Sequence, residues 1–184
     1  MDYEYYYNNA KNRYYDACSE INSKENRISE LRNEKKRLIN DINGYSAEIT
    51  KYTAALDALE KAVKTRDDVV RSCDKSQSSI EEANVNFSGM VASSNVTAKN
   101  LSDVYKTDTR NKINGVYEQL NLKKSSLNTK IAELKKQKSD SETALSLRES
   151  EIRNANSDIG YWESVKHNSS IDMEYYKKKM EEDT

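Results

Sequence analysis

The chain has 184 residues, of which 33% are charged and 35% hydrophobic, with 30 Lys and Arg against 31 Asp and Glu. It contains no proline and only four glycines, which argues against a sheet protein with many turns and against a large globular core. This composition is typical of long helices or of disorder, and the periodicity of the apolar residues distinguishes the two.

The first predicted element is a helix over residues 3–82, marked by a seven-residue repeat. Only Lys24, Lys35 and Arg66 are charged in its two apolar rows. This bias predicts a coiled-coil helix whose apolar seam packs against another helix. The rows are Tyr7, Tyr14, Ile21, Ile28, Lys35, Ile42, Ile49, Leu56, Val63 and Val70, and Tyr3, Ala10, Ala17, Lys24, Leu31, Leu38, Tyr45, Tyr52, Leu59, Arg66 and Cys73.

The repeat is lost over residues 84–96, where Asn, Ser and a glycine accumulate. These residue types end helices and cap new ones, so we expect a turn there. Because the segment lies near the middle of the chain, it predicts two helices that fold back into an antiparallel hairpin.

A second helix is predicted over residues 97–180, with a less regular seam. Its rows are Ile113, Leu120, Leu127, Leu134, Ser141, Arg148, Ala155 and Trp162, and Tyr117, Lys124, Ile131, Lys138, Leu145, Ile152, Ile159 and Lys166. The fold class is therefore all-α: a long antiparallel helical hairpin or coiled coil, in one elongated domain over residues 1–184. Gly44 and Gly115 are interpreted as local softening within helices, with hinges that divide the hairpin as the alternative.

A hairpin also predicts which residues face one another. With the turn centred near residue 90, the numbers of facing residues sum to about 180. Arg148 is then expected near Glu30 and Glu34, which would neutralise it. The predicted apolar pairs are Ile21 with Ile159, Ile28 with Ile152, and Ala17 with Trp162.

The sequence offers little chemistry for catalysis or metal binding. Cys18 and Cys73 are far apart and are interpreted as reduced thiols, and His167 is the single histidine. Glycine-rich phosphate loops are absent from the sequence. We therefore predict a non-enzymatic protein without a cofactor or metal.

Nucleic acids and membranes are not predicted as partners. Acidic and basic residues are balanced in both halves, without the basic stripe of a nucleic-acid binder. No apolar run approaches the roughly 20 residues that cross a bilayer. The acidic, aromatic start, Met1 to Tyr5, does not resemble a signal peptide.

Tyrosines gather near both ends of the chain, which a hairpin brings together at its open end. Exposed tyrosine is common at protein–protein contacts, although several of these side chains could simply pack fraying helix ends. The predicted partner-binding residues are Tyr5, Tyr6, Tyr15, Trp162, Tyr175 and Tyr176. Further apolar residues lie off the seam and suggest that a third or fourth helix packs there: Leu101, Val104, Val116, Leu122 and Val165.

The segment Phe87-Ser88-Gly89 between two amphipathic helices resembles the Trp-x-Gly turn of the WXG superfamily, helical hairpins of type VII secretion, with Phe87 in the aromatic place. Val104-Tyr105-Lys106 and the following heptads resemble the second helix of longer members encoded beside LXG toxins. The resemblance implies a cytoplasmic partner that binds the helical N-terminal domain of such a toxin and guides it to the secretion machine. Whether the partner is itself exported, without a signal peptide, is left open by the sequence. The alternative is a coiled-coil spacer or scaffold that forms a homo-dimer or larger homo-oligomer.

Overall fold

A computed structural model describes residues 2–87, 100, 103–104 and 108–182, and the helices α1 (Tyr3–Phe87) and α3 (Arg110–Glu182) account for most of them. The described residues include no strand. The all-α prediction is confirmed. The chain has no proline, the residue that removes a helical hydrogen bond and kinks or breaks a helix.

α1 begins where the sequence predicts and ends later. The Oδ1 of Asp2 accepts a hydrogen bond of 2.9 Å from the backbone N–H of Tyr5, which is the capping interaction that starts a helix. The helix then continues to Phe87, so residues 84–87 belong to it and were wrongly assigned to the turn. Asn and Val cost little in a helix interior, and the first glycine of this region is Gly89.

The start of the second helix also differs from the prediction. α3 begins at Arg110 rather than at residue 97, although Asn100 and residues 103–104 are helical and residues 108–109 form a wider helical turn just before it. Most of the predicted turn, including Ser88 and Gly89, lies outside the described residues.

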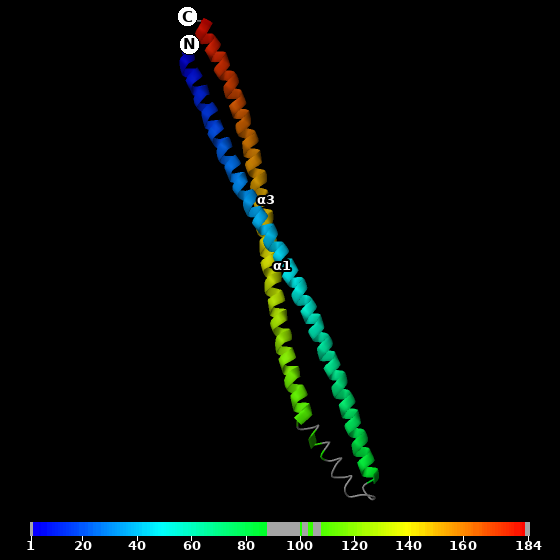
Figure 1. The fold of residues 1–184 in the computed structure, drawn as a ribbon. Coiled ribbons are helices and arrows are strands. Elements are labelled where there is room, and N and C mark those ends of the chain that lie inside the picture. The colour runs from blue at the N-terminus through cyan, green and yellow to red at the C-terminus, as the bar shows by residue number, and fades with distance from the viewer. Residues whose placement is uncertain (1, 88–99, 101–102, 105–107, 183–184) are drawn as a thin grey trace. The chain divides into compact units, whose positions relative to one another are not determined.

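The chain divides into two compact units. The first unit is Met1–Gly44 with Gln137–Thr184, and the second unit is Tyr45–Lys136. In each unit α1 and α3 lie side by side, and in the first unit the start of α1 lies beside the end of α3 (Figure 1).

Cross-helix pairs establish the direction of the helices in each unit. Residue numbers rise along α1 as they fall along α3, so the helices are antiparallel and the hairpin is confirmed. In the first unit the pairs are Arg13–Asp172 at 2.9 Å, Lys24–Asp158 at 2.8 Å and Lys35–Glu149 at 2.7 Å. In the second unit they are Lys124–Glu60 at 2.7 Å, Arg66–Asn114 at 2.7 Å and Arg110–Asp74 at 4.0 Å.

The predicted register is correct to within a few residues. Arg148 Nε lies 2.6 Å from Glu34, as expected, whereas Glu30 pairs with Arg27 of its own helix at 3.1 Å. Among the predicted apolar pairs, Ala17 and Ile28 are buried, while Ile21, Ile152, Ile159 and Trp162 are half-buried. Their individual pairings stay predictions.

The core is confined to the seam. Among the described residues, every buried apolar side chain lies in a predicted row, and buried Ser169 extends the row of Trp162 by one heptad. The first unit holds Ala10, Ala17, Ile28, Leu31, Ala155 and Ser169, and the second holds Ile131 and Leu134.

Both glycines in question lie inside continuous helix. α1 passes through Gly44 and α3 passes through Gly115 without a break, and a Cβ at either position would meet nothing within 4 Å. Neither glycine is therefore needed for close approach of the helices. The boundary between the two units on α1 falls directly after Gly44.

Candidate partner-binding surfaces

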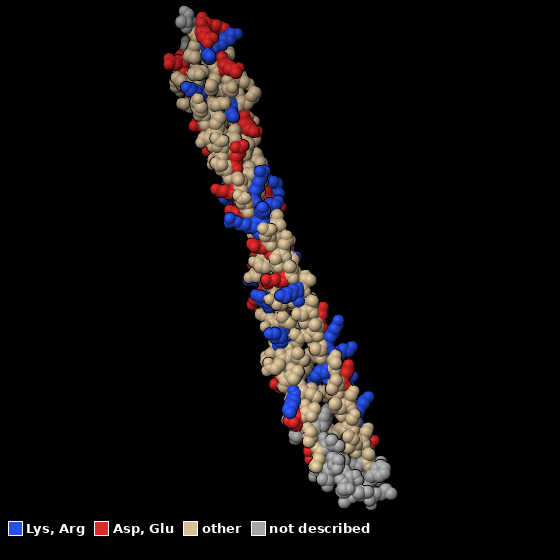
Figure 2. Space-filling model, viewed as in Figure 1, with Lys and Arg blue, Asp and Glu red and all other residues tan. Residues whose placement is uncertain are grey.

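Four basic side chains in the seam are paired with carboxylates of the other helix. Lys24, Lys35 and Arg148 in the first unit and Lys124 in the second each reach an acidic residue across the seam, at 2.6 to 2.8 Å. A charge beside an apolar seam is costly unless it is paired, so these contacts make the charged seam positions tolerable. On the face shown in Figure 2, basic and acidic side chains are mixed along both units.

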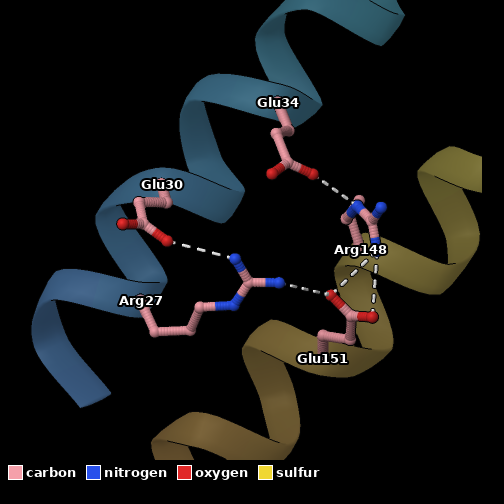
Figure 3. Close-up of polar contacts among 5 residues, drawn as sticks. All are labelled: Arg27, Glu30, Glu34, Arg148 and Glu151. Carbon is pink, nitrogen blue, oxygen red and sulfur yellow. Dashed lines mark hydrogen bonds and ion pairs between the residues drawn. The ribbon is translucent and has the colours of Figure 1, made fainter. Parts of the chain in front are cut away.

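Arg148 is the centre of the largest of these networks (Figure 3). Its Nε contacts Glu34 and its Nη1 contacts both carboxylate oxygens of Glu151, at 2.9 and 3.0 Å. Arg27 Nη2 approaches Glu151 at 3.7 Å, which joins both helices into one network. The charge of Glu151, assisted by that of Glu34, raises the pKa of Arg148 above its ordinary value.

Two simpler pairs show the same electrostatic effect. The hydrogen bond and charge of Asp158 raise the pKa of Lys24, and the hydrogen bond and charge of Lys35 lower the pKa of Glu149. In each case the partner stabilises the charged form.

Arg66 of the second unit is paired differently. Across the seam its Nη2 donates to the amide oxygen of Asn114 at 2.7 Å, and its guanidinium lies 4.4 Å from the centre of the Tyr117 ring. Its carboxylate partner, Asp67, comes from its own helix, at 2.8 Å. The Nε atom is buried and finds no hydrogen-bond partner among the described residues. An unpaired buried donor costs roughly 1–3 kcal/mol.

Arg66 borders an apolar groove between α1 and α3 in the second unit. The groove has a volume of about 650 Å³, and Val69 and Val116, on its opposite sides, are 48% and 57% exposed. Large exposed apolar side chains around a concavity indicate a binding surface. The lining residues, which define the apolar groove, are Ala62, Thr65, Arg66, Val69, Thr109, Lys112, Ile113, Val116 and Leu120.

A second exposed surface lies in the first unit, where four predicted partner-binding residues form a tyrosine cluster of Tyr5, Tyr6, Tyr175 and Tyr176. Tyr6 stacks on Tyr176 across the helices at 5.5 Å between ring centres. Tyr5 and Tyr175 meet these rings edge-on at 5.5 and 5.2 Å. The hairpin thus brings together residues from both ends of the sequence, and Tyr5 and Tyr175 stay more than half exposed.

The other two predicted contact residues do not join the tyrosine cluster. Tyr15 is 60% exposed and packs edge-on against its neighbour Tyr14, with ring centres 5.7 Å apart. Trp162 is half-buried and packs against Tyr161 at 5.2 Å. A role for any of the six residues in partner binding stays a prediction.

The sequence indicated only part of the apolar groove. Val116 was recognised as an apolar residue off the seam, and it lines the groove, whereas Leu122 is exposed elsewhere in the second unit. The heptad pattern does not single out Val69, because this residue stands beside the seam residue Val70. The usable signal was its position three residues after Arg66, on the same side of α1.

The described residues contain no group of three His, Cys, Asp or Glu side chains that could hold a metal. Cys18 and Cys73 are free and half-buried, and His167 is exposed. No helix in the described part of the chain is both long and apolar enough to cross a membrane.

Comparisons with known proteins identify no relative of this chain: no family model, no curated protein and no solved structure matches it.

Proposed function

We propose that this protein is a non-enzymatic helical partner that completes a helical bundle with another polypeptide. The observation that carries the proposal is the apolar groove of the second unit, with Val69 and Val116 exposed beside the seam. Two antiparallel helices bury one seam only, and apolar residues beside it become buried when further helices pack there.

The resemblance of Phe87-Ser88-Gly89 and the flanking heptads to the WXG superfamily supports a particular class of partner. We propose the helical N-terminal domain of an LXG-type toxin, bound in the cytoplasm and guided to a type VII secretion machine. The exposed Tyr5 and Tyr175 of the tyrosine cluster support a second contact with the same partner.

The test is co-expression with the product of a neighbouring LXG gene. We expect the tagged N-terminal domain of that toxin to retain this protein through affinity and size-exclusion steps, as a complex of defined mass by light scattering. An unrelated helical hairpin carrying the same tag serves as the control and should retain none. Failure to retain the protein contradicts the toxin-partner proposal.

The alternative function is a structural spacer that self-associates. It is favoured by the same exposed apolar side chains, since a second copy could cover them, and by the formal net charge of −1, which does not oppose self-association. Light scattering of the purified protein alone separates the two: a monomer supports a heterologous partner, and a stable dimer supports the spacer.

A further inference from the structure

We propose that the apolar groove is the docking site for one amphipathic helix of the partner, which packs apolar side chains between Val69 and Val116 and presents a carboxylate to Arg66. This inference rests on the proposed function in taking a helical partner as given. It adds the place of contact and the charge that the partner must carry.

The spacing of the lining residues fits a helix. On α1 the groove is lined by Ala62, Thr65 and Val69, and on α3 by Ile113, Val116 and Leu120. Each set advances by three and then four residues, so each lies along one side of its helix. At about 1.5 Å per residue the two rows extend over roughly two turns. A groove of this length between parallel ridges accepts the apolar anchors of an amphipathic helix at positions i, i+3 or i+4, and i+7.

The charge of the lining favours an acidic partner. Arg66 and Lys112 are its two charged residues, and none of the described lining residues is acidic. Lys112 pairs with Asp108 at 2.9 Å, but both side chains are largely exposed, so this contact leaves the lysine accessible. Asp67, which pairs with Arg66, and Asp108, which pairs with Lys112, do not line the groove, so an incoming carboxylate meets two basic side chains there.

Arg66 has donors to spare for such a carboxylate. Its guanidinium carries five N–H groups, while Asp67 and Asn114 each take one contact and Nε has no partner among the described residues. The seam residue Arg148 shows that one arginine can bind two carboxylates here: its Nε contacts Glu34 and its Nη1 contacts Glu151. A rotation of the Arg66 side chain toward the groove gives it a second carboxylate in the same way.

The experiment uses the full chain and synthetic helical peptides of about 20 residues, long enough to hold a helix in water. The peptides share one apolar row and differ at a single central position on that face, which is Glu, Gln or Lys. Binding is measured by fluorescence anisotropy. We expect the Glu peptide to bind about tenfold or more tightly than the Gln peptide, and the Lys peptide to bind most weakly.

Three variants assign the effect to the groove. Arg66→Met should remove most of the preference for Glu over Gln while the peptides still bind, since Lys112 is the cation that stays in the groove. Val116→Asp should weaken binding of all peptides. Leu122→Asp is the matched control, because Leu122 is 65% exposed in the same unit but does not line the groove, and it should change nothing. Circular dichroism of each variant verifies that its helices are retained.

Several results would overturn the inference: no saturable binding of any peptide, a preference for Glu that Arg66→Met leaves undiminished, or equal effects of Val116→Asp and Leu122→Asp. A dimer of the protein alone that Val116→Asp dissociates would show that a second copy covers the groove. If the toxin domain binds but Val116→Asp leaves that complex intact, the groove is wrong and the proposed function stands. If the Glu peptide binds as expected and the toxin domain does not, the groove stands and the toxin assignment fails.

Discussion

The first and second units use the same two helices and the same heptad repeat, but they differ in how completely the seam is buried. In the first unit small residues recur in the seam, and Ala10, Ala17, Ala155 and Ser169 are all buried. Small side chains allow two helices to approach closely and to exclude water from their neighbours, such as Leu31 at 1% exposed.

In the second unit the seam of α1 is bulkier and less buried. From Tyr45 to Cys73 the α1 seam contains no alanine, glycine or serine, and all of its positions are half-buried. Only Ile131 and Leu134, among the described residues of this unit, are buried. The apolar groove lies along this less buried part of the seam. The same repeat therefore forms a closely packed interface where small side chains recur and a less buried one where α1 lacks them.

The largest expected effect is on the core of the first unit. Leu31→Ala should lower the free energy of unfolding by roughly 2–5 kcal/mol, because Leu31 is buried and its removal leaves a cavity. Leu56→Ala, at a half-buried seam position of the second unit, should cost less than half as much. Urea unfolding followed by circular dichroism measures both. Equal losses would mean that the two units are packed alike.

A smaller loss of stability is expected when a larger side chain is placed at a seam position that is fully buried. Ala17→Leu should destabilise the protein by about 1–3 kcal/mol, since Ala17 is fully buried and a larger side chain forces the helices apart. Ala55→Leu places the same change at an exposed position of α1 in the second unit and should be close to neutral. The melting temperatures of the two variants check this. A neutral Ala17→Leu would contradict close packing at this site.

The smallest effect concerns the ion pairs, which both units share. Lys35 lowers the pKa of Glu149 below its ordinary value of 4.5, so this pair stabilises the fold above that pH and the stabilisation is lost as the pH falls through the lowered pKa. Lys35→Met should therefore melt below wild type at pH 7, and the difference should shrink in acid. Lys36→Met, at the exposed neighbouring position, is the control. A difference independent of pH would argue against this pair as its source.

Much of this fold follows from local features of the sequence. The absence of proline, the seven-residue repeat and its loss near residue 84 were enough to predict two antiparallel helices and a register correct to within a few residues, including the contact of Arg148 with Glu34. The end of α1 at Phe87 and the start of α3 at Arg110 were not predictable in the same way, because Asn and Ser are compatible with both helix and turn.

The candidate surfaces depended on the tertiary structure to different degrees. Both ends of the chain lie at the open end of a hairpin, and a small shift in register does not change this. The sequence therefore predicts that Tyr5, Tyr6, Tyr175 and Tyr176 come together. Only the tertiary structure shows that Tyr6 stacks on Tyr176. It also shows that Tyr15 packs against Tyr14 and Trp162 against Tyr161, apart from that cluster.

The sequence alone determined the helices, their direction and the residues that form the seam, because these depend on spacing along one chain. Only the tertiary structure decided which seam residues are buried, which carboxylate each basic residue takes, and that Arg66 lies beside an open groove. The physical reason is that burial and ion pairing depend on the size and charge of the residues that face one another across the two helices. The heptad repeat identifies the seam positions of each helix but not which residue of the other helix lies opposite each of them.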